Sequence, residues 1–408
     1  MADLSVRSLN LMNPFIIASS PATHGVKAVL KSARTLPGAV AMRNFGHGGG
    51  GGTYNSTSGE SMRAGGPATQ THALGTTIKD PFSSLAEFCE AVQTVRREMP
   101  ADVRLWVSIG HAMDIVTNSN WQKDWSRQAT ELQRAGADAL ELHFNTPGVA
   151  AFGGNRLMDC YRVIQFATKL VKQVATIPVM VKLPVEGCDP LRAMEAAVSA
   201  GADAIGPSAR WKAFVFDLDW RQTTAYPGGG YGGNQALPII CHAVAEARLS
   251  GGITTPIYAG GGVYSWDAAA KLIMAGSDAV QLGSLACCLG PGAVTDVIRE
   301  FDAWMDRSGH PDLQSLRGEA LQLFTMPDAA KKERQQRLGR AYHDAVVDPD
   351  KCSGCGHCVD ACWYDSLSLV DGKAEKAPTC IGCGYCFQVC ATGALRVDAG
   401  KVLASCDI

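Results

Sequence analysis

Two cysteine runs near the end of the chain have residue types and spacing that suit metal ligation. Each run has the pattern Cys-x2-Cys-x2-Cys-x3-Cys, at residues 352–362 and 380–390. Three thiolates at this spacing can hold three corners of one four-iron, four-sulfur cluster, while the fourth cysteine reaches the neighbouring cluster. The pattern therefore predicts two [4Fe-4S] clusters. The predicted ligand sets are Cys352, Cys355, Cys358 and Cys390 for one cluster, and Cys380, Cys383, Cys386 and Cys362 for the other.

Zinc is the alternative occupant of these runs, because four cysteines also bind a zinc ion. Zinc motifs usually pair two Cys-x2-Cys units, so the longer runs favour clusters. Nine of the 15 cysteines follow residue 350. Such a block indicates a metal site in a reducing compartment rather than a disulfide framework. The first ten residues lack a basic start followed by an apolar stretch, so we expect a cytoplasmic protein that is not membrane-bound.

The residues before these runs alternate short apolar stretches with amphipathic stretches of helical length. Apolar runs rich in Val, Ile, Ala and Leu are typical of strands buried on both faces of a parallel sheet. Eight strands with intervening helices predict an α/β fold, a (β/α)8 TIM barrel, with a doubly wound open sheet as the alternative. The expected strands are residues 15–20, 39–44, 104–109, 139–144, 178–183, 202–207, 256–261 and 278–283.

The predicted domain organisation has three parts. A barrel occupies residues 1–312, a charged helical connector occupies 313–347, and a small α+β domain like a bacterial ferredoxin occupies 348–408. Two long glycine-containing loops, 45–83 and 208–237, follow the second and sixth strands, where a barrel carries its active-site loops. Long loops in compact domains are usually functional, although a flexible surface linker is the alternative.

A flavin is the cofactor that usually couples single electrons from clusters to chemistry on an organic substrate. Glycine-rich segments end the seventh and eighth expected strands, where barrels commonly bind phosphate. Lys182 lies at the end of the fifth expected strand, where it would supply a cation at the same end of the barrel as these glycines. The alternative is that Lys182 is only a solvated strand end. These features predict that the barrel binds a phosphorylated flavin.

At this point the sequence resembles a known family. The segments NPFIIASSPAT, ALELHFNTPG, PVMVKLP, GADAIG, YGGN, IYAGGGV and VQLGS, followed by the cysteine runs, resemble the flavin-and-cluster half of dihydropyrimidine dehydrogenase. Over the barrel they resemble the wider dihydroorotate dehydrogenase family. The resemblance implies FMN at the barrel mouth, and it implies a position near FMN for the following residues. They are Ala18, Ser19, Ser20, Arg43, His143 and Lys182 around the ring, and Gly233, Gly261, Gly262, Gly283 and Ser284 at the phosphate.

The departures from the family concern the proton donor and the substrate. The family's cysteine or serine after the fourth strand is Thr146 here, and its asparagine is His143. Either Thr146 or His143 is our candidate for proton transfer, although His143 equally suits a plain hydrogen bond to flavin.

The family's pyrimidine-binding Asn-Thr pair is Ala209 and Arg210 here, so we doubt that uracil, thymine or orotate is the substrate. Arg210 suits either a substrate carboxylate or a surface acid. The further candidate substrate ligands are Asn145, His47 and His111.

The leading hypothesis is an oxidoreductase acting on CH–CH groups. Electrons would pass between clusters and FMN, and then to an activated C=C bond of a small cyclic or conjugated substrate, or in reverse. The alternatives are an electron-transfer subunit without its own substrate, and a barrel isomerase or aldolase. No Rossmann unit is evident, so we expect a ferredoxin-like donor or a separate NAD(P)H–flavin subunit. The resemblance suggests a homo-oligomer, and a net charge of −2 gives no sign of nucleic-acid or membrane partners.

Overall fold

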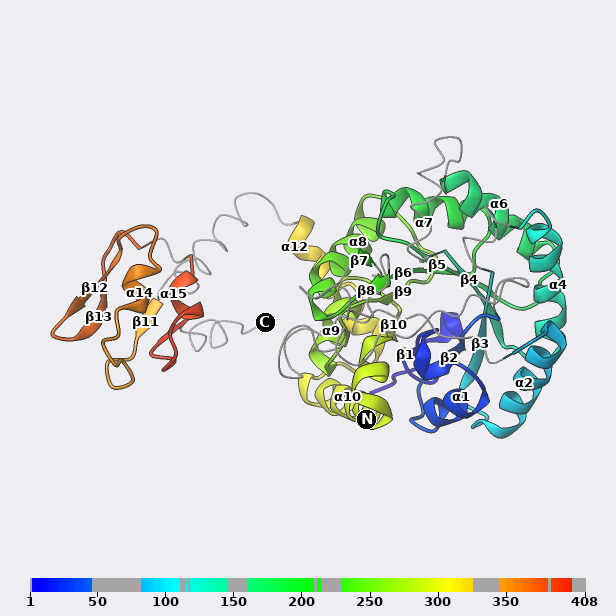
Figure 1. Cartoon of the computed structure of the whole chain (residues 1–408), viewed down its shortest axis with the longest axis horizontal. Helices are drawn as coiled ribbons and strands as arrows, with labels where there is room; N and C mark the ends of the chain where they lie inside the picture. The colour runs from blue at the N-terminus through cyan, green and yellow to red at the C-terminus, as the bar shows by residue number, and fades with distance from the viewer. Residues whose placement is uncertain are drawn as a thin grey trace, which may run out of the picture. The chain divides into compact units, whose positions relative to one another are not determined.

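The computed structural model describes residues 2–45, 82–110, 115, 118–144, 160–208, 211–213, 229–325, 345–380 and 383–397. The chain separates into two compact units, Met1–Gln322 and Leu323–Ile408. Each unit is described by itself below, and both are drawn in Figure 1. Among the described helices, none combines the length and apolar character needed to cross a bilayer.

The first unit is built on eight parallel strands. Their order in the sheet is β6-β5-β4-β3-β2-β1-β10-β9. Parallel bridges Ile205↔Ile257 and Ser208↔Gly260 join β6 to β9, so the sheet closes on itself. This closure confirms the (β/α)8 barrel and excludes an open doubly wound sheet. The strands are β1 Phe15–Ile17, β2 Ala39–Met42, β3 Arg104–Ile109, β4 Ala139–His143, β5 Val179–Leu183, β6 Ala204–Pro207, β9 Tyr258–Gly260 and β10 Ala279–Leu282.

Amphipathic helices surround the strands (Figure 1). Ser84 caps α2 by accepting the Glu87 N–H at 3.2 Å, and Asp189 caps α7 by accepting the Arg192 N–H at 2.9 Å. Helix α10 is kinked at Gly290, where φ is 79°. The helices are α1 Val26–Ala33, α2 Leu85–Glu98, α4 Trp121–Arg134, α6 Cys160–Lys172, α7 Pro190–Ser199, α8 Leu237–Leu249, α9 Trp266–Met274 and α10 Ser284–Ser308. Short 3-10 turns are η1 Arg7–Leu9, η2 Pro21–Thr23 and η3 Asn234–Ala236.

The sequence Ala-Gly-[Ala/Ser]-Asp occurs three times, each time between a helix and the next strand. Its glycines have left-handed φ angles, which a residue with a side chain adopts only with strain. They are Gly136 at 105°, Gly201 at 88° and Gly276 at 112°. The glycines therefore allow a tight turn between each helix and the next strand.

The aspartate of each motif fastens the start of a strand to a helix. Each carboxylate accepts a backbone N–H at the start of the preceding parallel strand, and each pairs with a basic side chain. The contacts are Asp138 with Leu105 N (2.7 Å) and Arg96, Asp203 with Val179 N (2.7 Å) and Lys172, and Asp278 with Ile257 N (2.8 Å) and Arg248. Side chains therefore reinforce the barrel at the amino ends of its strands.

Residues 313–322 belong to the barrel unit, although the sequence assigns them to the connector. Helix α11, Leu313–Leu316, buries both of its terminal leucines. Arg317 then pairs with the buried Asp278, and the Gly318 N–H donates to the Ile273 carbonyl at 3.0 Å. After it come η4 Glu319–Leu321 and α12 Gln322–Thr325, while residues 326–344 of the expected connector lie outside the described part of the chain.

The loop after β6 contains a short hairpin that the sequence analysis does not predict. Strands β7 Trp211–Ala213 and β8 Gly229–Tyr231 pair antiparallel. Neither stretch, WKA or GGY, alternates apolar and polar residues over a length that identifies a strand.

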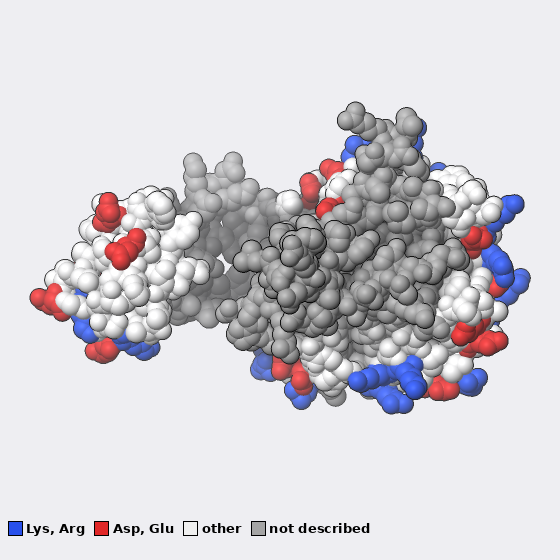
Figure 2. All heavy atoms as spheres, viewed as in Figure 1, with Lys and Arg blue, Asp and Glu red and all other residues white. Residues whose placement is uncertain are grey.

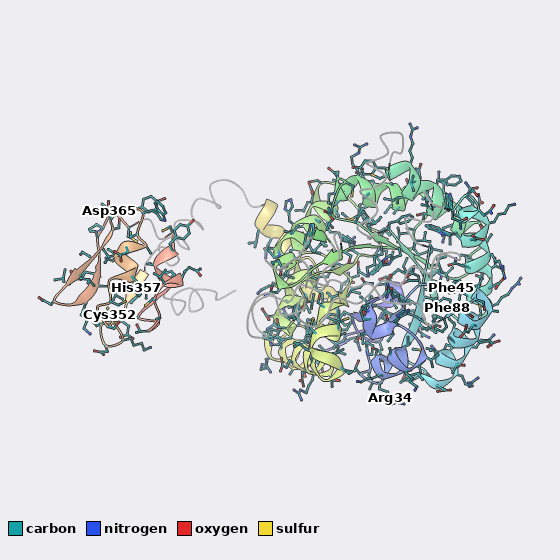
Figure 3. The ribbon with its side chains drawn as sticks, viewed as in Figure 1. Arg34, Phe45, Phe88, Cys352, His357 and Asp365 are labelled. Atoms are coloured by element: carbon teal, nitrogen blue, oxygen red, sulfur yellow. The ribbon has the colours of Figure 1, made fainter. Side chains whose placement is uncertain are left out.

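Charged side chains of both signs are interspersed along the rim of the described barrel surface in Figure 2. Aromatic packing extends from the end of β2 to the outer ring. Phe45 stacks on Phe88 of α2 with ring centroids 5.9 Å apart (Figure 3). The helix α2 is thereby fixed beside the carboxyl end of β2.

The described residues 345–380 and 383–397 of the second unit form two small antiparallel sheets and two short helices. Gly356 and Gly384, with φ of 80° and 81°, cap the two helices and turn the chain into them. This arrangement confirms the expected ferredoxin-like domain. The elements are β11 Ala345–Val347 paired with β14 Leu395–Val397, β12 Leu367–Val370 paired with β13 Lys373–Lys376, α14 His357–Asp360 and α15 Tyr385–Gln388.

Candidate functional site

Among the described residues of the second unit, four cysteines line each of two hollows. One hollow of about 340 Å³, including space open to solvent, is lined by Cys352, Cys355, Cys358 and Cys390. The other, of about 350 Å³, is lined by Cys362, Cys380, Cys383 and Cys386. Each group takes three cysteines from one run and the fourth from the other. The groups have the same members as the two crossed ligand sets that the spacing predicts.

Backbone N–H groups point at three of these sulfurs. Ala374 N donates to Cys352 Sγ at 3.3 Å, Ser366 N to Cys362 Sγ at 3.3 Å, and Leu395 N to Cys390 Sγ at 3.4 Å. Hydrogen bonds to sulfur stabilise thiolates and help to set the potential of an iron–sulfur cluster. The backbone of this domain is therefore arranged for anionic sulfur ligands.

The thiol pKa values differ with burial. Backbone N–H donation, first from Ala374 and then from Gly354, lowers the pKa of Cys352. Burial raises the pKa of Cys386 to about 11, and the nearby Cys380 sulfur raises it further. A bound metal cation lowers the pKa of its thiol ligands, so iron at this site would favour the thiolate form of Cys386. Figure 3 labels Cys352 and His357 within this domain.

The carboxyl ends of the eight strands define the mouth of the barrel, where such folds carry their sites. His143, the last residue of β4, is paired in register with Lys182 of β5. Both residues are buried, with 4% and 3% of their surface exposed. The Phe144 N–H donates to the Lys182 carbonyl at 2.9 Å, which holds the two strand ends together. The structure thus places a histidine and a lysine side by side at the mouth.

A buried polar cluster lies within the barrel interior. Glu141 of β4 is 0% exposed. Its Oε1 accepts from Ser108 Oγ at 3.1 Å, and its Oε2 accepts from Gln281 Nε2 at 3.0 Å. Its Oε1 also lies 3.9 Å from Lys182 Nζ. Because β4 and β10 lie on opposite sides of the barrel in the strand order, the Gln281 bond crosses the barrel interior.

An aromatic pair lies in the same interior. The ring of Tyr258 meets the ring of Trp106 edge-on at 5.2 Å between centroids. Gly206 makes room for this arrangement, since a Cβ there would lie 2.6 Å from the Tyr258 ring. Burial, and then the charge of Glu141, raises the pKa of Tyr258. The tyrosine hydroxyl is therefore neutral beside the carboxylate.

Glycines at the ends of β9 and β10 bring backbone close together, as a phosphate site requires. Gly262 has a φ of 79°, and a Cβ there would lie 2.6 Å from the backbone nitrogen of Leu237. Gly261, with a φ of 139°, precedes it. Gly233 is buried immediately before η3. Gly283 precedes Ser284, the first residue of α10.

The segment after β1 meets Arg43 and the first turn of α10. Burial lowers the pKa of His24 to about 4, and the Arg43 guanidinium lowers it further. Burial raises the pKa of the Cys287 thiol, while a hydrogen bond with Ser20 and the charge of Arg43 act in the opposite direction. A neutral histidine, a neutral thiol and a guanidinium therefore gather beside the mouth.

The described residues fit an FMN molecule at this mouth. Ser19 Oγ and Gln281 Oε1 are buried without a hydrogen-bond partner among the described atoms, and buried polar atoms normally have one. Two cationic side chains, Arg43 and Lys182, lie at this end of the barrel, and positive charge suits a phosphorylated ligand whose ring gains negative charge on reduction. Gly262 supplies a close backbone approach that a side chain would block.

The other sequence-predicted site residues lie outside the described part of the chain. These are His47, His111, Asn145, Thr146 and Arg210. The predicted residues of the barrel that the structure does describe lie at the carboxyl ends of strands, apart from Gly233. Ala18, Ser19 and Ser20 follow β1, Arg43 follows β2, Gly261 and Gly262 follow β9, and Gly283 and Ser284 follow β10. His143 ends β4, Lys182 lies in β5, and Gly233 precedes η3.

The sequence analysis missed the interior polar residues. Glu141 lies two residues before His143 in an apolar strand, so both side chains share one face of β4. Gln281 occupies a similar position in β10. The sequence did contain a signal for Glu141, because a charged residue inside an otherwise apolar strand indicates a buried polar contact.

Comparison with known proteins follows the same division of the chain. Residues 84–305, more than half of the 408-residue chain, match the family model described as dihydroorotate dehydrogenase. Residues 344–391 match the model described as a 4Fe-4S dicluster domain. The two matches fall on the barrel and on the cysteine-lined unit.

Individual relatives agree with these matches. The catalytic subunit of dihydroorotate dehydrogenase B (NAD(+)) from Alkaliphilus metalliredigens is 30% identical over 197 residues, which is 48% of this chain and 64% of that protein. The NAD-dependent dihydropyrimidine dehydrogenase subunit PreA from Escherichia coli K12 is 25% identical over 271 residues, 63% of each chain. The match covers less than two thirds of either relative. With more than half of its length matched by the family model, the chain belongs to the dihydroorotate dehydrogenase family.

Proposed function

We propose that this chain is an iron–sulfur flavoprotein oxidoreductase that acts on CH–CH groups. One observation carries the proposal. The same chain has a barrel with a buried lysine and histidine at its mouth, and two hollows that are each lined by cysteines from both runs. In this proposal FMN occupies the mouth, and each hollow holds one [4Fe-4S] cluster. When bound, FMN would couple single electrons from the clusters to electron pairs on an organic substrate.

The residues of the mouth have separate roles in this proposal. Lys182 holds a positive charge where the ring would accept electrons. The backbone at Gly261 and Gly262 would hold the phosphate. His143, with 4% of its surface exposed, orients the ring or holds a proton at its imidazole. Thr146 is the candidate for delivering that proton to the substrate carbon.

The substrate in this proposal is a small conjugated or cyclic molecule with an activated C=C bond. Uracil and orotate are not favoured, because Ala209 and Arg210 stand where the resembled enzymes carry their pyrimidine-binding Asn-Thr pair. Arg210 would suit a substrate carboxylate.

The electron donor in this proposal is a ferredoxin-like protein or a separate NAD(P)H–flavin subunit. Two relatives are named as subunits of NAD-linked enzymes, and they support the second donor.

The test is substrate-dependent reoxidation of the reduced full-length chain. The anaerobically purified protein is reduced with a chemical reductant, and its flavin absorbance is followed while conjugated carboxylates and cyclic enones are added singly. We expect at least one compound to reoxidise the flavin. Thr146→Ala should slow that step while Thr146→Ser, which keeps a hydroxyl, preserves most of it. Reoxidation by redox proteins alone would instead support an electron-transfer subunit.

A further inference from the structure

Glu141 is a carboxylate that the proposed chemistry leaves without a role. It is 0% exposed, and it lies one inward-facing position below His143 on β4. Burying a carboxylate in a barrel interior is costly unless its oxygens are hydrogen-bonded or paired. Here Ser108 and Gln281 donate to the two oxygens at 3.1 and 3.0 Å. The site is therefore built to hold a carboxylate, since both donors come from strands other than β4.

The same carboxylate faces the lysine of the mouth. Glu141 Oε1 lies 3.9 Å from Lys182 Nζ, and the two side chains are 0% and 4% exposed. A buried ion pair at this distance contributes little to net stability, because desolvation offsets the attraction. Each charge nevertheless acts strongly on its surroundings, because the protein interior screens charge less than water does. The pair is thus better suited to controlling a local field than to stabilising the fold.

We propose that Glu141 is a positioning residue, anchored across the barrel by Gln281, that orients the Lys182 ammonium and moderates its charge toward the ring above it. This inference rests on the proposed function, in which FMN occupies the mouth. Gln281 and Ser108 fix the carboxylate, and the carboxylate in turn fixes the ammonium. The negative charge beneath Lys182 then limits how strongly the lysine stabilises added electrons.

The sign of the effect follows from the charges. Reduction adds negative charge to a flavin, and an ammonium nearby stabilises it. The Glu141 carboxylate offsets part of that positive field. Its neutralisation in Glu141→Gln should therefore raise the midpoint potential of the flavin. A tenfold change in the preference for reduced over oxidised flavin corresponds to about 30 mV for a two-electron couple.

The experiment is a double-mutant cycle on the full chain with its cofactors bound. The flavin midpoint potential is measured for the wild type, Glu141→Gln, Lys182→Met and the double variant. We expect Glu141→Gln to raise the potential in the wild-type background. The effect should be much smaller in Lys182→Met, because a carboxylate buried without its cation is held as the neutral acid and then carries no charge to remove. An unchanged potential in Glu141→Gln, or an equal shift in both backgrounds, would overturn the inference.

Two further variants separate this role from a structural one. Asp278→Asn removes another buried carboxylate, at the amino end of β10, and should lower stability without moving the potential. Ser108→Ala removes the hydroxyl that shares Oε1 with Lys182, which leaves more of the carboxylate charge uncompensated below the ring, so it should lower the potential. Ser108→Ala is a small change, so it tests the proposal if Glu141→Gln does not fold. An unchanged flavin midpoint potential in Ser108→Ala would refute the proposal. A wild-type chain that binds no flavin would instead refute the proposed function.

Discussion

The three aspartates that fasten strands to helices predict a graded stability series. Replacing each with asparagine keeps a side-chain oxygen that can accept the strand N–H, but it removes the negative charge from its basic partner. The three sites share a motif and differ in burial. Asp278 and Arg248 are 4% and 12% exposed, while Asp138 and Arg96 are 30% and 25% exposed. Asp203 and Lys172 are 39% and 30% exposed.

The magnitude follows from that difference in exposure. Removing one partner of a buried ion pair costs about 3–5 kcal/mol, because a desolvated charge is left behind. Asp278 accepts from both Arg248 and Arg317, so its loss leaves two guanidinium groups without a counter-charge. A half-exposed pair contributes about 1 kcal/mol or less. We therefore expect Asp278→Asn to destabilise the barrel by about 3–5 kcal/mol, and the other two changes by about 1 kcal/mol each.

Thermal unfolding of the full chain, followed by far-ultraviolet circular dichroism, measures the series. At about 2–4 °C per kcal/mol for a large domain, Asp278→Asn should lower the Tm by roughly 6–15 °C, and Asp138→Asn and Asp203→Asn by a few degrees. Equal losses at all three sites would refute the reasoning, because burial would then have no influence on the cost. A smaller loss at Asp278 than at Asp203 would refute it more strongly.

Three further outcomes are expected. Cys358→Ser, at a buried member of the first cysteine set, should reduce iron from about eight to about four atoms per chain while FMN content stays unchanged, as measured by metal analysis and absorbance. Lys182→Met should lower the flavin midpoint potential, because it removes a buried positive charge; a potential equal to that of the wild type would contradict the role of the lysine. Thr146→Ala should slow substrate turnover without loss of iron or FMN, and unaltered turnover would remove Thr146 from the mechanism.

The barrel could be predicted because its strands are buried on both faces. Residues 104–109 and 179–183 are mainly apolar runs with few polar residues, and both form strands. The Ala-Gly-[Ala/Ser]-Asp turns could be predicted because glycine has a specific backbone role at a helix end. These are local signals, and local signals are what a single sequence carries.

Contacts between distant residues could not be predicted in the same way. The bond from Gln281 to Glu141 joins strands on opposite sides of the barrel, and only closure of the sheet reveals it. Leu313 and Leu316 belong to the barrel because they are buried against it, although their neighbours in sequence resemble a solvated connector. The cysteine sets are the exception, since the fixed geometry of a cluster relates residues that are distant in sequence.

A reductive titration tests the central claim most directly. The anaerobically purified full chain is titrated with a chemical reductant while the absorbance of flavin and of iron–sulfur clusters is recorded. With one FMN and two [4Fe-4S] clusters, the chain should take up about four electrons, two on the flavin and one on each cluster. Uptake by a flavin alone, by clusters alone, or by neither in a colourless preparation would contradict the account.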